Sequence, residues 1–588
     1  MISRRKILQL ALFSPLAAAL PKAQSFRSSL LAAPSAVVST DDVSRVKVER
    51  RWKGSVCESQ IVNHGTHPVR IKEVVLFDLS LSLPARTRLY GEGFQMLSQT
   101  GGTLGQPTDL GNYTDPKHYK LPKGFYGMMT LSPSTREHHL LAFTSCRRFI
   151  GQFYLEHPSL KVVVDTEGQE LKPGETWQLE PFIYLTGNDR EKLLDELASQ
   201  LVANHPPLRF PAPPTGWCSW YCFGPRVTAQ QVLDNLDFIA KHASGLRYVQ
   251  IDDGYQPAMG DWLETGAAFG GNVQGVLKQI RERGFEPAIW VAPFIAEEKS
   301  RVFQQHPDWF VQDFGGGPLR SDTVTFGGWR HGPWYVLDGT HPEVQQHFES
   351  FFRTMKRDWG CTYFKLDANF WGAIHGGRFH DPRATRIEAY RRGMKAILRG
   401  VENSFVLGCN HPIWPSLGLI HGSRSSNDIK RTWERIETTA RQNLSRNWQN
   451  GRLWWNDSDA IVLTGDLPDN EFQFHAVAIY ASGGMLLSGD DLTKIPPDKL
   501  AMLRKLLPPS GVAARFDDDS FRVGRVQLGR REVVSVLNWT NEPQNISINL
   551  PRRCRITDFW SDVVLGTHSG TFTINDMPAR SGRLLICE

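Results

Sequence analysis

Polar and apolar residues alternate along residues 363–370, YFKLDANF, where a lysine, an aspartate and an asparagine occupy every second position. Successive side chains of a strand point to opposite faces, so Lys365, Asp367 and Asn369 are predicted to share one face. Phe364, Leu366 and Ala368 share the opposite face, which is apolar and is predicted to pack against other apolar residues. Such a segment is an edge strand with a wet side, a buried ion pair, or part of a functional site, and the octapeptide alone leaves these alternatives open.

Strand-like runs alternate with amphipathic helices over the central 300 residues or so. The runs RYVQIDDGY, FEPAIWVAPF, TYFKLDANF and SFVLGCNHP are predicted strands. In the helical segment TAQQVLDNLDFIAKHA, Thr228 and Gln231 form a predicted capping box, and two later helices end at Gly284 and Gly360. Repeated β-then-α units favour a (β/α)8 TIM barrel over a doubly wound sheet, because no glycine-rich nucleotide turn follows the first strand.

The flanking regions have β patterns. Short β-type runs separated by Gly, Pro and Asn predict an N-terminal β-sandwich, which is followed by a helix and the proline-rich HPPLRFPAPPTG. Short β segments return near the C-terminus and predict a small second β-sandwich. We therefore expect an N-terminal β-sandwich domain with a connecting helix at 40–205, a catalytic barrel at 210–508 and a C-terminal β-sandwich at 511–588.

The first 25 residues have a basic start, a short apolar stretch and small residues near a possible cleavage point. Arg4 and Arg5 before an Ile-Leu pair resemble a twin-arginine export signal, although a cytosolic helix with two chance arginines is the alternative. We expect residues 1–25 to direct the protein to the periplasm or the extracellular space. No other segment approaches the length of a membrane span.

Composition excludes some classes of partner. The formal charge is +6, from 67 basic and 61 acidic residues, and it is not gathered into long basic runs, so nucleic acid is not expected as a partner. Eight cysteines lack paired zinc-type spacing, so no metal framework is expected. Spacing leaves open whether Cys218 and Cys222 form a disulfide, and the sequence leaves the oligomeric state open.

Polar and aromatic residues recur at the ends of the predicted barrel strands. Trp220 follows the first strand, Asp252 and Asp253 follow the second, and Trp290 lies near the end of the third. The fifth predicted strand ends at Cys409 and Asn410. Because the carboxyl ends of barrel strands surround the active site, we expect these side chains to meet Asp367 in one pocket.

The motifs also resemble a known family. FKLDANF resembles the Lys-x-Asp-x-Asn nucleophile motif of α-galactosidases in glycoside hydrolase families 27 and 36. GWCSW, IDDG, HPDWF and LDGTHPEV resemble other segments of these families, in the same order through about residues 215–495. SRSSNDIKRTW resembles the segment that carries the acid/base aspartate. Several motifs in the right order are more specific than any one of them.

The resemblance implies a retaining exo-glycosidase that releases terminal α-linked galactose from oligosaccharides or glycoconjugates, without metal or cofactor. It implies that Asp367 is the nucleophile and Asp428 the acid/base. Such an enzyme needs one ionised carboxylate and one protonated carboxyl group, and neighbouring cations favour the ionised form of Asp367. The implied substrate-binding residues are Trp220, Asp252, Asp253, Trp290, Lys365, Asn369, Cys409, Asn410 and Arg424.

Each of these residues also has an ordinary structural interpretation. Asp252 and Asp253 precede a glycine and could form a turn, while Asp428 could cap the helix that follows it. Asp457 and Asp459, in the motif WNDSD, are expected to orient neighbours rather than react.

Two departures from the families bear on substrate and activity. CNHPIWPSLG differs from the residues that both families use on the fifth strand, where the 2-substituent of the sugar is recognised. The predicted N-terminal domain is also shorter than the large sandwich usual in family 36. The altered fifth strand leaves an α-N-acetylgalactosaminidase and a β-L-arabinopyranosidase as alternatives. A transglycosidase of the raffinose-synthase type is another, because raffinose synthases resemble the same families, and a non-catalytic carbohydrate-binding protein is the alternative of another class. Export argues against the transglycosidase, and the two carboxylates argue against the binding protein.

Overall fold

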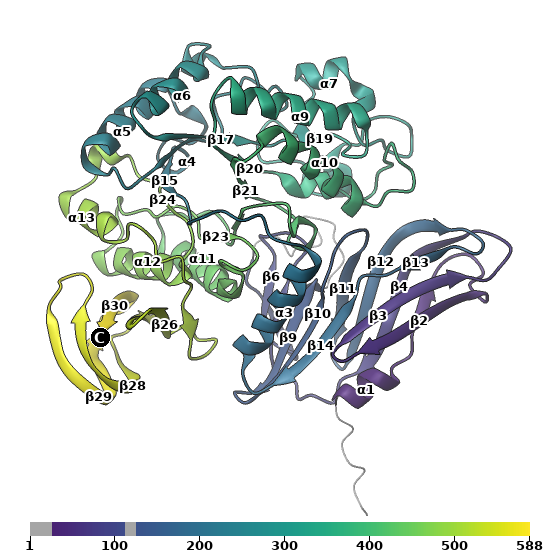
Figure 1. Ribbon diagram of the computed structural model, residues 1–588, viewed down its shortest axis with the longest axis horizontal. Coiled ribbons are helices and arrows are strands. Elements are labelled where there is room, and N and C mark those ends of the chain that lie inside the picture. The colour runs from purple at the N-terminus through teal and green to yellow at the C-terminus, as the bar shows by residue number, and fades with distance from the viewer. Residues whose placement is uncertain (1–25, 112–124) are drawn as a thin grey trace, which may run out of the picture.

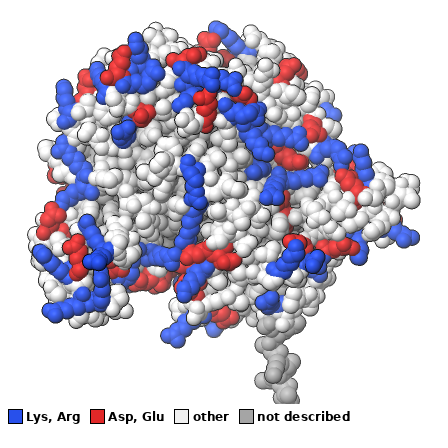
Figure 2. Space-filling view, viewed as in Figure 1, with Lys and Arg blue, Asp and Glu red and all other residues white. Residues whose placement is uncertain are grey.

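The computed structural model describes residues 26–111 and 125–588, which form a central barrel and two β domains (Figure 1). Residues 1–25, for which an export signal is predicted, lie outside the described residues. No helix in the described ranges is long and apolar enough to cross a membrane. Basic and acidic side chains are interspersed over the face shown in Figure 2.

The barrel is an eight-stranded parallel sheet with the strand order β23-β22-β21-β20-β17-β16-β15-β24. Bridges from Asp457 to Met485 and from Ile461 to Ser488 bring β23 beside β24 and close the sheet. The predicted (β/α)8 barrel is therefore confirmed. Its strands are β15 (Thr215–Cys218), β16 (Tyr248–Ile251), β17 (Glu286–Val291), β20 (Tyr363–Leu366), β21 (Phe405–Gly408), β22 (Gly422–Arg424), β23 (Trp455–Asp457) and β24 (Leu486–Ser488).

Helices with one apolar face connect the barrel strands. The first long one, α5, begins with the predicted capping box, in which the side chains of Thr228 and Gln231 each accept a backbone N–H of the other residue. Gly284 and Gly360 follow two later helices at φ of +81° and +76°, which residues with a Cβ rarely adopt. The helices from the barrel region are α4 (Trp220–Phe223), α5 (Ala229–His242), α6 (Val273–Glu282), α7 (Arg301–Gln305), α8 (Ser321–Val324), α9 (Pro342–Arg357), α10 (Arg386–Val401), α11 (Trp433–Ser445), α12 (Asp469–Ser482) and α13 (Pro497–Lys505). The short strands β18 (Ile295–Ala296) and β19 (Tyr335–Val336) pair outside the barrel sheet.

The N-terminal domain is a sandwich of two antiparallel sheets, and its core holds packed phenylalanines such as Phe77 and Phe182, whose ring centroids are 5.2 Å apart. The first sheet contains β1 (Ala36–Val38), β4 (Val69–Ser80), β12 (Ser159–Leu171), β11 (Ile150–Glu156) and β8 (Phe125–Tyr126). The second contains β13 (Thr176–Gln178), β3 (Val56–Asn63), β14 (Phe182–Gly187), β10 (Glu137–Phe143), β9 (Met128–Ser134), β5 (Arg88–Glu92), β6 (Gln99–Thr103), β7 (Gln106–Asp109) and β2 (Val46–Lys53). Helix α1 (Phe26–Ala32) precedes the sheets, and the connecting helix α3 (Arg190–Asn204) follows them.

The C-terminal domain is a single antiparallel sheet of six strands, with a hydrophobic cluster on each face. Register shifts interrupt the long β28–β29 pair, and such bulges bend a sheet. Its strands are β25 (Arg515–Phe516), β26 (Val523–Leu528), β27 (Arg531–Asn538), β30 (Ser581–Cys587), β28 (Gln544–Asp558) and β29 (Val564–Met577).

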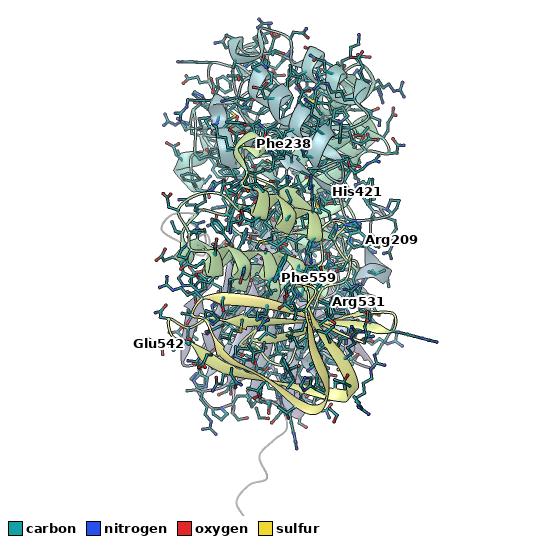
Figure 3. The ribbon with its side chains drawn as sticks, turned by 90° about the vertical axis from the view of Figure 1, so that its left-hand side faces the viewer. Arg209, Phe238, His421, Arg531, Glu542 and Phe559 are labelled. Carbon is teal, nitrogen blue, oxygen red and sulfur yellow. The ribbon has the colours of Figure 1, made fainter. Side chains whose placement is uncertain are left out.

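The C-terminal sheet lies against helix α12, and Phe559 lies at this junction (Figure 3), 5.5 Å from the ring of Tyr480. Strand β30 approaches α12 so closely that a Cβ on Gly582 would lie 2.8 Å from Val477. A larger residue at Gly582 would therefore push the sheet away from the barrel.

A fully buried ion pair joins the N-terminal domain to the barrel. The side chains of Glu92, at the end of β5, and Arg446, just after α11, are both 0% exposed, and Arg446 Nη2 lies 2.5 Å from Glu92 Oε2. Tyr90 donates to Glu92 at 2.9 Å, and Gln449 donates to it at 3.2 Å. The same guanidinium donates to the backbone carbonyls of Met96 and Ser425. Burial alone would disfavour both charges, so each depends on the other.

We expect Glu92→Ala to lower the free energy of unfolding by about 3–5 kcal/mol, because it leaves the Arg446 charge buried without its partner. Urea unfolding followed by tryptophan fluorescence measures this loss. The control is Glu58→Ala, which removes an ion pair with Lys53 whose side chains are 47% and 54% exposed. The control should change the free energy by no more than about 0.5 kcal/mol. Equal losses in the two variants would show that the buried pair does not hold the domains together.

Candidate active site

A cavity of about 200 Å³ opens at the carboxyl ends of the barrel strands. It is smaller than the ~300–1,000 Å³ of pockets that hold drug-sized ligands, and its size suits a single sugar unit. The structure places nine of the predicted site residues in its wall, together with four that the sequence did not indicate. The lining residues are Met96, Leu97, Trp220, Asp252, Asp253, Trp290, Trp329, Lys365, Asp367, Cys409, Asn410, Asn427 and Asp428.

Asp367 directly follows the carboxyl end of β20, and three hydrogen-bond donors contact its carboxylate. Trp290 Nε1 donates to Oδ2 at 3.0 Å, Asn410 Nδ2 donates to Oδ1 at 2.8 Å, and the backbone N–H of Ala368 donates to Oδ1 at 2.7 Å. The side chain is buried, at 8% exposure. Both oxygens are thus oriented as acceptors, the role of an ionised carboxylate.

The strand alternation stops before Asn369. Strand β20 ends at Leu366, and Ala368 has a left-handed backbone with φ of +53°. Asn369 begins a short 3₁₀ helix, is fully buried and donates to the Leu366 carbonyl at 3.1 Å. The expectation that Asn369 shares the pocket face with Lys365 and Asp367 is therefore wrong, because the strand ends before Asn369 and the cavity lining does not include it.

Asp252 and Lys365 form a buried ion pair in the pocket wall, with Lys365 Nζ 2.9 Å from Asp252 Oδ2. Burial opposes the ammonium charge of Lys365 and is the largest single influence on it, but the carboxylate of Asp252 together with the nearby Cys218 and Cys409 outweighs burial and raises the pKa of Lys365. Gln250 Nε2 donates to the same Asp252 oxygen at 2.7 Å. Asp252 is therefore part of a buried polar network, not an exposed turn.

Asp253 is held by an arginine that the sequence did not indicate. Arg330 Nε donates to Asp253 Oδ2 at 3.2 Å, its Nη2 pairs with Oδ1, and Gln256 Nε2 donates to Oδ1 at 2.6 Å. Burial raises the pKa of Asp253, and the Arg330 charge opposes that rise. Arg330 lies in the loop between α8 and β19, next to Trp329, which is 38% exposed at the pocket. No periodicity marks that loop in the sequence.

Asp428 projects into the cavity and does not cap a helix. Helix α11 begins at Trp433 with Thr432 as its N-cap, so the capping interpretation of Asp428 is wrong. The Asp428 side chain is 53% exposed, and its Oδ1 accepts from Arg424 Nη2 at 3.0 Å and from the Tyr221 hydroxyl at 3.3 Å. Arg424 does not line the cavity. It is 1% exposed and contacts the cavity wall through Asp428 and Cys409.

The N-terminal domain contributes an apolar part of the pocket wall. Met96 N donates to the His411 carbonyl at 3.0 Å, which places Met96 and Leu97 beside the segment that carries Asn410. This contact joins residues from different domains, so no local sequence pattern indicates it.

Cys218 and Cys222 are free thiols in the structure. Cys409 lies in the pocket wall, where Arg424 Nη1 is 3.7 Å from its sulfur. Burial raises the pKa of the Cys409 thiol, and the nearby Asp367 adds to the rise. In the described ranges, no group of three or more His, Cys, Asp or Glu residues is arranged to hold a metal ion.

Comparisons with known proteins agree with the motifs. The Melibiase family model matches residues 230–405. A myogenesis-regulating glycosidase of Mus musculus is 30% identical over 153 residues, which are 26% of this chain and 20% of that protein. An A type blood α-D-galactosamine galactosaminidase of Flavonifractor plautii is 28% identical over 204 residues, which are 33% of this chain and 18% of that protein. The chain thus spans about a fifth of the length of these two relatives.

Solved structures of lower identity share the fold. The α-galactosidase TtGalA of Thermus thermophilus, in complex with p-nitrophenyl α-D-galactopyranoside, has a TM-score of 0.63 at 22% identity, over 80% of this chain and 98% of that one. A family 36 α-galactosidase AgaA variant of Geobacillus stearothermophilus, with 1-deoxygalactonojirimycin, has a TM-score of 0.66 at 14% identity, over 94% and 83%. Together with the family model, these matches confirm the resemblance to glycoside hydrolases of the α-galactosidase type.

Proposed function

We propose that the protein is a retaining exo-glycosidase that hydrolyses terminal α-linked galactosides. The observation that carries this proposal is the pair of carboxylates in one cavity, buried Asp367 with three donors and half-exposed Asp428. A retaining glycosidase needs this difference, since one carboxylate attacks while the other delivers and recovers a proton. The relatives described as α-galactosidases support the choice of sugar.

In the first step, an oxygen of Asp367 attacks the anomeric carbon, and Asp428 donates its proton to the departing glycosidic oxygen. The products are a covalent β-galactosyl ester on Asp367 and the free alcohol. In the second step, ionised Asp428 takes a proton from water, and the water oxygen displaces the Asp367 carboxylate. The sugar leaves with its α configuration retained.

The opposite side of the cavity would bind the sugar hydroxyls. Asp252 and Asp253 are acceptors held by Lys365 and Arg330, so their free lone pairs are fixed in direction. The family resemblance assigns them to the 4- and 6-hydroxyls. Trp220 supplies a flat apolar surface for the C–H face of the ring.

A galactosaminidase is the second candidate. One relative is described as acting on galactosamine, and the segment after β21 departs from the expected residues for the 2-substituent. In this structure the side-chain amide of Asn410, whose backbone φ is +43°, donates to Asp367. Met96 and Leu97 form the apolar part of the cavity wall beside Asn410.

The proposed function predicts that p-nitrophenyl α-galactoside is cleaved faster than the matching α-N-acetylgalactosaminide and β-L-arabinopyranoside, and that an alkyl galactoside releases the α anomer first. Initial rates across this panel and proton NMR of the first-formed sugar test both points. Initial appearance of the β anomer would overturn double displacement, and a preference for either of the other glycosides would overturn the choice of sugar.

We expect Asp367→Ala to lower kcat by ~10³-fold or more, because the covalent step is lost. Added azide should partly restore turnover and give a β-galactosyl azide, detectable by NMR. The control is Asp237→Ala on helix α5, which removes a surface aspartate that is 53% exposed and pairs with Arg283. Near-normal activity of Asp367→Ala without azide would place the nucleophile elsewhere.

For Asp428→Ala, we expect a loss that depends on the leaving group. An activated phenol departs with little protonation, so its glycosylation step should slow far less than that of an alkyl or sugar leaving group, where general acid catalysis supplies ~10²–10⁴-fold. Pre-steady-state rates with both substrates measure the difference. Equal losses on the two substrates would remove Asp428 from the acid/base role.

A further inference from the structure

One arginine nitrogen and one tyrosine hydroxyl bridge two carboxylates next to the cavity. Arg424 Nη2 lies 2.5 Å from Asp459 Oδ1 and 3.0 Å from Asp428 Oδ1. It also donates to the Tyr221 hydroxyl at 2.6 Å. That hydroxyl lies 2.5 Å from Asp459 Oδ2 and 3.3 Å from Asp428 Oδ1. Asp428 thus shares both of these side-chain contacts with Asp459.

The two carboxylates differ in how firmly they are held. Asp459 is 4% exposed, and its oxygens accept the backbone N–H groups of Ile429 and Ala460, each at 2.7 Å. Its backbone has φ of +74°, a strained position that fixes where the side chain begins. Asp428 is half-exposed, so it can exchange its proton with water or with a bound substrate. Asp459 is therefore the fixed partner and Asp428 the adjustable one.

The sharing of Arg424 matters because its positive charge favours the ionised form of Asp428, whereas an acid catalyst must be protonated. A guanidinium 3.0 Å from a carboxyl group stabilises the ionised carboxylate, whereas Asp428 must begin the proposed reaction protonated. The Tyr221 hydroxyl has only one hydrogen, and its shorter contact is to Asp459, so that hydrogen is directed mainly away from Asp428.

We propose that Asp459, with Tyr221, is a positioning residue that draws the Arg424 charge away from Asp428 and so lets Asp428 keep its proton at the working pH. This inference rests on the proposed function and adds a control on its acid/base group. When Asp428 ionises after proton transfer, the same Arg424 nitrogen is already within reach to stabilise it for the second step.

The surrounding charges are consistent with this division. Burial raises the pKa of Asp459 to about 6, opposed by Arg424 and reinforced by Asp428 and Asp457, so Asp459 carries the charge that competes for Arg424 above that pH. Asp457 Oδ2 lies 3.9 Å from Arg424 Nε, so one guanidinium faces three carboxylates. The titratable and charged groups that face Arg424 and Asp428 are Tyr221 from α4, Lys365 and Asp367 from the end of β20, Cys409 after β21, Arg435 from α11, and Asp457 and Asp459 from β23 and the turn after it.

The test is the pH dependence of kcat/KM for Asp459→Asn with a methyl α-galactoside, whose leaving group needs a proton. Asparagine keeps the size of the side chain and tolerates a positive φ. Without the Asp459 charge, Arg424 pairs with Asp428 alone, and the repulsion between the Asp459 and Asp428 carboxylates is removed. Both changes favour the ionised form of Asp428. We expect the fall of kcat/KM on the alkaline side of its pH profile, the alkaline limb, to occur about one pH unit lower than in the wild-type enzyme. For an activated phenyl galactoside this shift should be much smaller.

Two further variants separate charge from structure. Tyr221→Phe removes the bridging hydroxyl but none of the charges, so its alkaline limb should move less than half as far. Asp490→Asn removes another buried aspartate, paired with Arg431 at 2.8 Å and with no contact to Asp428, and should leave the limb in place. If Asp459→Asn does not fold, Asp457→Asn takes its place, with a smaller shift in the same direction.

An unmoved limb in a folded Asp459→Asn enzyme, or an equal move in Asp490→Asn, would overturn the inference. If only Asp457→Asn folds, an unmoved limb in that variant would do the same. Failure of the wild-type protein to cleave either galactoside would overturn the proposed function instead, so the two failures are distinguishable.

Discussion

The shape of the pocket depends on the contacts that the guanidinium of Arg446 makes. It pairs with Glu92 of the N-terminal sandwich and donates to the backbone of Met96 and Ser425, with no exposure to solvent. Met96 then lies in the cavity wall, and Ser425 directly follows Arg424. One buried cation therefore fixes the position of the apolar wall and of the strand end that leads to Asp428.

The charged residues around the cavity form separate ion pairs. Asp252 is paired with Lys365, Asp253 with Arg330, and Asp459 with Arg424. Asp367 has donors but no direct cation contact among the described ion pairs, and Asp428 shares the cation of its neighbour. A low-dielectric site strengthens each of these pairings, so a change at one carboxylate affects the proton affinity of the next.

The sequence predicted the strands and most of the pocket because both follow local rules. Apolar runs located β16, β17, β20 and β21, and polar residues at strand ends located Asp252, Asp367 and Asn410. The alternation rule failed at Asn369, where a left-handed residue turns the chain. The capping rule for Asp428 failed because α11 begins at Trp433, several residues later.

The residues that the sequence missed have no local signal. Arg330 lies in an irregular loop, 77 residues from the Asp253 that it holds. Met96 and Leu97 belong to another domain and look like ordinary core residues in the chain. Asp459 was expected to orient its neighbours, but only the distances show that it shares Arg424 with Asp428. Contacts over long sequence separations depend on the assembled fold, which pattern alone does not specify.

The separation between Glu92 and Arg446 is 354 residues, and this has a consequence for biosynthesis. The N-terminal sandwich leaves the ribosome first, with its Glu92 carboxylate still lacking the arginine that neutralises it. A buried carboxylate without a partner is unfavourable, so this edge of the sandwich should stay hydrated until most of the barrel has been synthesised. We therefore expect the pocket wall to form late in folding, because a nascent chain that stops before α11 contains Asp367 and Asp428 but lacks Arg446.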